Sequence, residues 1–145
     1  ARHFSGRRLG NSNSTLWGGW MIEAPMQRIF FSGDSGYGPH FKEIGQRFGP
    51  IDIALLDTGQ YNSRWRAIHM VPKQSLQAAK DLRARILMPV HWGAFTLSLH
   101  PWDEPAEQTK LLAQQQNQAF VIPRIGELMQ LLHEPIVRNS WWQKY

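Results

Sequence analysis

Three polar clusters carry the residues that could do chemistry in this chain, and each cluster directly follows an apolar run. Asp34 lies between glycines in the segment Phe30–Phe41 (FFSGDSGYGPHF), at the end of the first of these runs. The segment Asp57–Tyr61 (DTGQY) follows the run IDIALL, and His91 follows the run ILMPV. Loops at strand ends are where α/β proteins hold ligands, because the rigid strand keeps the polar groups of the loop in place.

Imidazole and carboxylate side chains together suit zinc, manganese or iron. Two further histidines, His3 and His69, lie in segments without a helical or strand period. A hydrolytic metal site uses such groups to lower the pKa of a bound water to about 7. The candidate ligands are far apart in sequence, so other roles stay open. Asp34 could cap the helix that follows it, His91 could be a buried hydrogen-bonded histidine, and His69 could be an ordinary loop residue.

The elements that must position these groups alternate between strands and helices, which predicts an α/β layered fold. Apolar patterns predict strands at Thr15–Ile22, Arg28–Ser32, Ile51–Leu56 and Ile86–Val90. The first two strands should pair as a hairpin. Helical spacing predicts helices at Pro39–Phe48, from Pro72 through Leu82, and at Pro105–Gln118. A closing pair of strands is expected at Phe120–Ile122 and Glu127–Leu132, before a C-terminal tail at residues 134–145.

Composition limits the class of protein. The chain has 145 residues, of which 42% are hydrophobic and 19% charged, as in a single globular domain. Its formal net charge of +5 favours anionic partners, but no nucleic-acid-binding motif appears, so we expect no nucleic-acid partner. The absence of cysteine excludes cysteine-ligated zinc and fits a cytoplasmic location. No apolar run reaches the ~20 residues of a transmembrane segment, and peripheral membrane contact stays open.

Seven short motifs follow one another between residues 2 and 105. They are WGGW at 17–20, FSGDSGY at 31–37, FKEIG at 41–45, RFGP at 47–50, GQY at 59–61, HMVP at 69–72 and HWGAF at 91–95. Their order resembles the C-terminal half of the metallo-β-lactamase superfamily, in the branch of N-acyl-phosphatidylethanolamine-hydrolysing phospholipase D. The resemblance implies an αββα sandwich with a two-zinc site between its sheets. Residues 1–133 would supply the C-terminal half of that domain, a mixed sheet with helices on one face.

The resemblance also implies roles for individual residues. Asp34 resembles the carboxylate that bridges both metals, and His3 and His91 resemble histidine ligands of the first and the second metal. His69 resembles a histidine near the scissile phosphate that is not a metal ligand. Asp34 and His69 are therefore the expected catalytic residues, and the expected substrate-binding residues are Tyr61 and Trp92.

Departures from the family pattern carry further expectations. The motif His-x-His-x-Asp-His, which supplies four ligands in the family's first half, is absent from this chain. Asp57-Thr58 stands where the family has an apolar approach to Gly59, which adds a carboxylate near the site. The chain starts at Ala1 without a methionine, so we expect it to begin inside a longer protein. Because zinc sites need about four ligands, we also expect it to bind zinc weakly or not at all by itself. One face of its sheet should be uncovered and apolar, and should pair with a second copy or with a separate N-terminal fragment.

Two functions from different classes stay open. The first is a metal-dependent phosphodiesterase with phospholipid as the implied substrate class, of which this chain is an incomplete and by itself inactive half. The second is a non-catalytic remnant that acts as an oligomeric interaction or structural module. A phosphate or nucleotide binder is the weakest alternative, because the chain has no glycine-rich phosphate loop.

Overall fold

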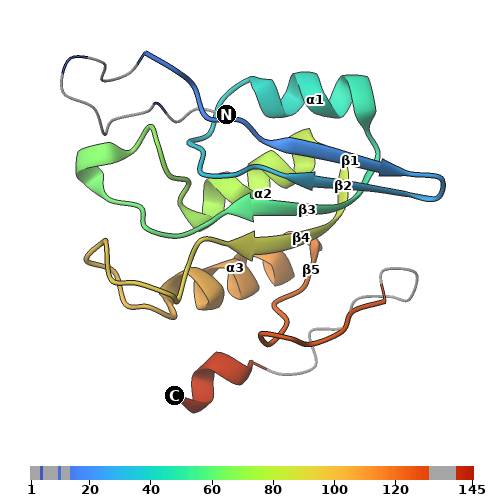
Figure 1. The fold of residues 1–145 in the computed structure, drawn as a ribbon. Helices are drawn as coiled ribbons and strands as arrows, with labels where there is room; N and C mark the ends of the chain where they lie inside the picture. Colours follow the sequence, from blue (N-terminus) through green and yellow to red (C-terminus); the bar gives the residue numbers. More distant parts are fainter. Residues whose placement is uncertain (1–3, 5–9, 11–13, 131–139) are drawn as a thin grey trace.

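The structure is a computed structural model, and it describes residues 4, 10, 14–130 and 140–145. Five strands form one mixed sheet in the order β1-β2-β3-β4-β5 (Figure 1). β1 (Trp20–Ala24) and β2 (Gln27–Phe31) are antiparallel. From β2 onward, the strands β3 (Ile51–Asp57), β4 (Ala84–Val90) and β5 (Ala119–Phe120) continue the sheet in parallel.

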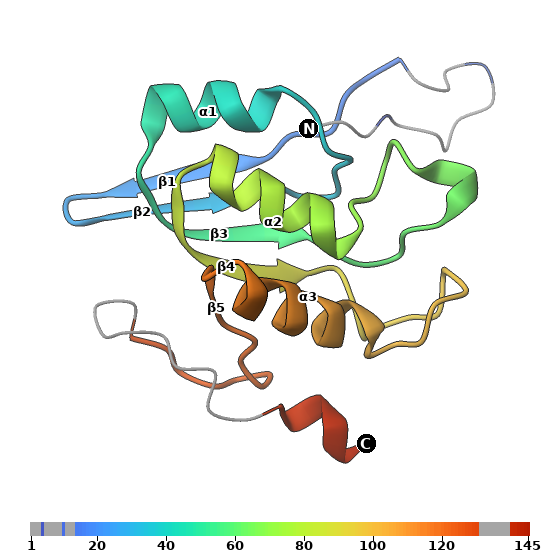
Figure 2. The same ribbon diagram turned by 180° about the vertical axis from the view of Figure 1, so that it is seen from behind.

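Three α-helices connect the parallel strands and lie on the same face of the sheet (Figures 1 and 2). They are α1 (His40–Phe48), α2 (Pro72–Asp81) and α3 (Glu104–Gln115). Because each parallel pair is joined through a helix, the carboxyl ends of β2, β3 and β4 meet at one edge of the sheet. This mixed sheet with helices on one face confirms the predicted fold class. Within the part of the chain that is described, none of the helices combines the length and apolarity of a bilayer-spanning segment.

The main core lies between the sheet and the helices. Alternate residues of the central strands, among them Ala54, Leu56 and Leu87, are fully buried there against Phe41 of α1 and Leu76 of α2. A strand exposes successive side chains to opposite faces, so the residues between these point away from the helices. Burying each large apolar side chain contributes about 1.5–3 kcal/mol, which holds the strand ends in fixed register.

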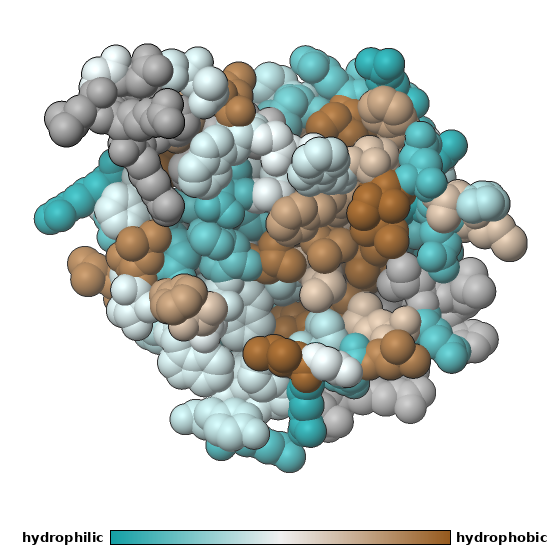
Figure 3. Space-filling model, viewed as in Figure 1, coloured by the Kyte–Doolittle hydropathy of each residue, from teal (hydrophilic) through white to brown (hydrophobic). Residues whose placement is uncertain are grey.

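The opposite face of the sheet is apolar, and no helix among the described residues covers it. Ile53 and Ile86 form a smaller cluster there, together with Val121 and Met129 from the segment after β5. The register pairs Trp20 with Phe31 and Ile22 with Ile29, which puts these four side chains on this face as well. Trp20 is 70% exposed, and Ile22 and Phe31 are also exposed. Figure 3, which views the molecule from this side, shows apolar residues gathered across its middle. Ile53 and Ile86 are themselves buried, so the exposed part of this surface lies over β1 and β2. We call this exposed part, with Trp20, Ile22 and Phe31, the uncovered face; the expectation of an uncovered apolar face is met there and not over β3 and β4.

Element boundaries differ from the predictions in several places, among them the first strand, which begins at Trp20 and not at Thr15. The first hairpin turns at Pro25 and Met26 alone, because both strands extend into the segment expected to be the turn. The expected closing pair of strands is wrong. β5 pairs in parallel with β4, and residues 127–130 form no strand, while Leu131 and Leu132 lie outside the described residues. Pro123 lacks the N–H that would extend the strand, and the chain turns between Arg124 and Glu127.

The end of the predicted C-terminal tail packs against α3. Trp142, in the short helix η2 (Trp141–Lys144), is 1% exposed and its indole N–H donates to Glu107. Lys110 Nζ donates to Ser140 Oγ over 2.7 Å. Residues 140–145 are therefore held by the domain, whereas the sequence predicts only a tail there; residues 134–139 lie outside the described residues.

Candidate metal centre

Asp34 lies in the turn that follows β2, and this turn packs closely against the loop that carries His69. Gly36 allows the approach, because a Cβ atom there would lie 1.8 Å from the carbonyl oxygen of Ala67. α1 begins with Pro39 as its N-cap residue and has no side-chain capping bond. The alternative role of Asp34 as a helix cap is therefore wrong.

His91 directly follows β4 and has a φ of 68°. Few residues other than glycine adopt this left-handed conformation, and such strained positions cluster at functional sites. The loop after β3 lies directly against His91, because a Cβ atom on Gly59 would be 2.1 Å from the His91 carbonyl oxygen. The contact of Gly59 with the His91 backbone thus fixes the position of the His91 Cα atom, from which its side chain extends.

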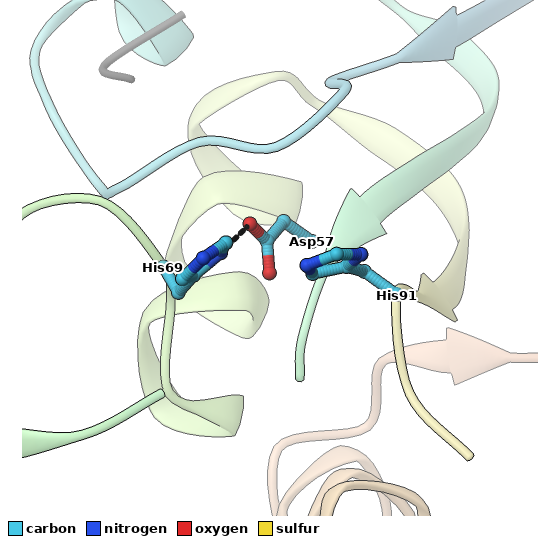
Figure 4. Close-up of side chains that lie close together, drawn as sticks. All are labelled: Asp57, His69 and His91. Atoms are coloured by element: carbon cyan, nitrogen blue, oxygen red, sulfur yellow. Dashed lines mark hydrogen bonds and ion pairs between the residues drawn. The ribbon is translucent and has the colours of Figure 1, made fainter. Parts of the chain in front are cut away.

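These loops bring three of the sequence-predicted site residues together. His91 Nδ1 lies 3.6 Å from Asp34 Oδ1. The rings of His69 and His91 stack with their centroids 4.9 Å apart. His69 Nδ1 in turn lies 2.8 Å from Asp57 Oδ2. Figure 4 shows the Asp57 carboxylate beside the two imidazole rings, with a dashed line from it to His69. Residues 34, 57, 69 and 91 therefore form one site at the carboxyl edge of the sheet.

The donor atoms of Asp34 and His91 fit a shared metal ion. With zinc bonds of about 2.0–2.1 Å to nitrogen and oxygen in tetrahedral geometry, two ligands of one ion stand about 3.3 Å apart. The separation of 3.6 Å is close to that value. Both side chains are about one third exposed, so an ion can reach them from solvent. His3, the other expected ligand, lies outside the described residues.

Asp57 belongs to one of the three polar clusters of the sequence, but it is not among the expected site residues. Its side chain is 0% exposed, and burial raises the pKa of its carboxyl group, an effect that the hydrogen bond from His69 partly opposes. The backbone N–H of Ser35 also donates to Asp57 Oδ2, over 2.9 Å. The available signal is a carboxylate at the last position of the strand IDIALLD, directly after the apolar run IALL.

The expected substrate-binding residues have well-defined structural contacts. Tyr61 Oη donates to Glu104 Oε1 over 2.6 Å, and the Tyr61 ring stacks on His100. Burial and the Glu104 carboxylate both raise the Tyr61 pKa above its ordinary value. Trp92 stacks on Trp102 and Trp141, and its indole N–H donates to the carbonyl of Pro89. These contacts anchor both residues, and their role in substrate binding stays a prediction.

This chain is similar to a known protein family and to several known proteins. The family model described as a beta-lactamase superfamily domain matches residues 1–92. The outer membrane protein RomA of Klebsiella pneumoniae is 56% identical over 93 residues, which are 64% of this chain and 70% of RomA. An N-acyl-phosphatidylethanolamine-hydrolyzing phospholipase D 1 of Caenorhabditis elegans is 32% identical over 136 residues, which are 88% of this chain and 38% of that protein.

The fold has solved counterparts as well. The structure of Igni18, a metallo hydrolase from Ignicoccus hospitalis, matches with a TM-score of 0.61 over 88% of this chain and 48% of Igni18. The two are 21% identical, so this likeness concerns the fold alone. The chain also spans 39% of a Mycobacterium tuberculosis relative that is 40% identical over 146 residues and aligns with 99% of this chain. Several relatives are thus much longer than this chain.

Proposed function

The chain belongs to the β-lactamase superfamily of metal-dependent hydrolases, and we propose that it supplies part of a metal centre that hydrolyses a phosphodiester. The observation that carries the proposal is the 3.6 Å approach of His91 Nδ1 to Asp34 Oδ1, with the His69 ring stacked on His91. The similarity to a phospholipase D that hydrolyses N-acyl-phosphatidylethanolamine supports phospholipid as the substrate class.

The residues of the site would have different roles in this reaction. Asp34 and His91 would hold the ion, and their carboxylate and imidazole donors suit zinc. A metal bound there would supply a water of lowered pKa and stabilise negative charge on the phosphate. His69 would contact the phosphate group, because its ring lies against His91 and its Nδ1 is held by Asp57.

We propose that the isolated chain is incomplete as an enzyme. Asp34 and His91 give two ligands, and a zinc site needs about four. The uncovered face supports pairing through the sheet, either with a second copy of the chain or with an N-terminal segment that brings the other ligands. The greater length of the mycobacterial and worm relatives supports the second arrangement.

Peripheral contact with a membrane, in a protein of cytoplasmic location, is part of the same proposal. Phe95, Leu97 and Leu99 are exposed in the loop that follows His91. The side chain of Gln60 bonds the backbone of this loop at Phe95, Leu97 and Ser98, which holds the three apolar side chains outward. Apolar side chains on a basic protein favour an anionic lipid surface. Replacing all three by serine should reduce cosedimentation with phosphatidylglycerol vesicles; equal cosedimentation would contradict this contact.

Zinc titration with elemental analysis of the purified chain tests the metal centre. We expect weak zinc binding that is lost in His91→Gln and in Asp34→Asn. Asp103→Asn is the matched control, because Asp103 precedes α3 without a capping bond and should leave zinc binding unchanged. Zinc binding that is equal in all four proteins would refute the proposed ligands. Two tightly held metals per chain would show that the site is complete and that the proposed incompleteness is wrong.

The uncovered face also favours the second candidate function, a non-catalytic module that acts by self-association. Size-exclusion chromatography with light scattering separates the two. A stable dimer that holds no zinc at any concentration tested would favour the module over the hydrolase. A stable monomer would count against pairing of two copies through the uncovered face and leave the N-terminal segment as the proposed partner.

A further inference from the structure

The carboxylate of Asp57 is the most deeply buried charged group that the described site contains. It is 0% exposed at the end of β3, and its oxygens are surrounded by donors. Oδ2 accepts from Ser35 N over 2.9 Å and faces His69 Nδ1 at 2.8 Å, while Gly59 N lies 3.4 Å from Oδ1. An unpaired buried carboxylate would be strongly destabilising, so these donors are what keep Asp57 in place.

Asp57, His69 and His91 could together be taken for a metal site, because one ligand atom from each lies within 4.8 Å of the others. The distances argue otherwise. Two ligands of one zinc ion stand about 3.3 Å apart, whereas 2.8 Å is the length of a hydrogen bond to a charged acceptor. Asp57 Oδ2 also already accepts from the Ser35 backbone.

The backbone of Asp57 is held as firmly as its side chain. Its N–H donates to Ser32 Oγ over 2.9 Å, and its carbonyl accepts from Ser75 Oγ over 2.8 Å. Ser32 follows β2 and Ser75 belongs to α2, so the residue is fixed from both sides of the site. The backbone N–H of Ser35, which donates to the Asp57 carboxylate, belongs to the residue next to Asp34. One buried carboxylate thus connects the Asp34 turn with the His69 ring.

We propose that Asp57 is a positioning residue, not a metal ligand, and that its Oδ2 fixes the His69 ring and the Asp34 turn relative to His91. A carboxylate only accepts, so Nδ1 of His69 must carry the proton that lies between them. The neutral ring is then held in the Nδ1–H tautomer, with its proton on the side of Asp57. Outer partners of this kind commonly set the tautomer and orientation of histidines in metal sites. This inference deepens the proposed function, on which its catalytic consequence rests.

The test is the His69 tautomer in the metal-free chain, measured by long-range ¹H–¹⁵N NMR on ¹⁵N-histidine-labelled protein. His69→Gln assigns the resonances, and the ¹⁵N chemical shifts of the two ring nitrogens distinguish the two neutral tautomers from the doubly protonated ring. We expect the Nδ1–H tautomer in the wild type and growth of the Nε2–H tautomer in Asp57→Ala. Asp57→Asn keeps an acceptor oxygen without its charge, so it should move the Nδ1–H proton to higher field even if Asp57→Ala does not fold.

Asp52→Asn is the matched control, because Asp52 is on the same strand and its Oδ2 accepts from Arg28 N over 2.8 Å, away from the site. It should leave the His69 spectrum unchanged. An Nε2–H tautomer in the wild type, or a His69 spectrum that is unaltered in Asp57→Asn, would overturn the inference. If Asp57→Asn loses zinc binding as completely as His91→Gln does, Asp57 is a metal ligand and the inference is overturned. A wild-type chain that forms a stable dimer and holds no zinc at any concentration tested would favour the non-catalytic module over the proposed function and leave the tautomer result standing.

Discussion

Replacing Gly59 with alanine should force apart the loop after β3 and the backbone of His91. The new Cβ atom would lie 2.1 Å from the His91 carbonyl oxygen and 2.8 Å from its carbonyl carbon. Both are backbone atoms, so no side-chain rotation relieves the overlap. His91 already has a left-handed backbone conformation, with a φ of 68°, which leaves little room to adjust.

The size of the effect follows from that overlap. Relief to an ordinary contact requires a shift of about 1 Å, and overpacking of this kind costs about 1–3 kcal/mol. For a chain of this length each kcal/mol lowers Tm by roughly 2–4 °C, so the expected loss is about 2–12 °C. Metal–ligand distances tolerate deviations of only about 0.2 Å, so the same shift of His91 should also weaken zinc binding.

Thermal unfolding followed by circular dichroism, with and without zinc, measures both effects. Gly18→Ala is the matched control, because a Cβ atom on Gly18 meets nothing within 4 Å. Its stability should stay within about 0.5 kcal/mol of the wild type. If Gly59→Ala unfolds at the wild-type temperature and binds zinc as the wild type does, the close approach of Gly59 to His91 does not exist and the account of the site is wrong.

Two further substitutions test the surroundings of the site. Trp142→Ala removes a side chain that is 1% exposed and packs on Trp92. It should lower the free energy of unfolding, measured in urea, by about 3–5 kcal/mol. The control Leu128→Ala changes an exposed side chain and should alter this free energy by less than about 0.5 kcal/mol. Tyr61→Phe removes a phenol whose pKa is raised above 10.0 by burial and by Glu104. The unfolded wild-type chain releases this proton first, so the wild type alone loses stability through this group as the pH rises past about 10. The stability difference between wild type and Tyr61→Phe should therefore narrow between about pH 8 and about pH 11, and a constant difference would contradict the raised pKa.

The central strands and the three helices could be predicted from the sequence because burial leaves a local pattern. Strands that are largely buried on both faces have nearly continuous apolar runs, and IDIALL and ILMPV predict β3 and β4 for this reason. α1 was recognised from the spacing of Phe41, Ile44 and Phe48. The region after Phe120 lacks such a pattern, and its expected second strand is not formed by residues 127–130.

The site could be predicted only in part, because its members meet through contacts between distant residues. The resemblance to a known family identified Asp34, His69 and His91, and the structure brings these three together. It carried no expectation that Asp57 would bond His69, which lies 12 residues further along the chain. No local period describes such a contact, and the close approach of Gly36 to Ala67 is of the same kind.

The different surroundings of Asp34 and Asp57 come from a difference in strand length. The two carboxylates lie at the ends of neighbouring strands, and the pairing of Phe31 with Leu55 sets the register of these strands. β2 ends at Phe31, whereas β3 continues two residues further, to Asp57. The turn after β2 therefore folds over Asp57, where Ser32 Oγ and Ser35 N bond it. Asp34 lies on the outer side of that same turn and stays 31% exposed. Environments that differ in this way assign different roles to chemically identical groups, so the exposed carboxylate suits a metal ion and the buried one suits the positioning of a histidine.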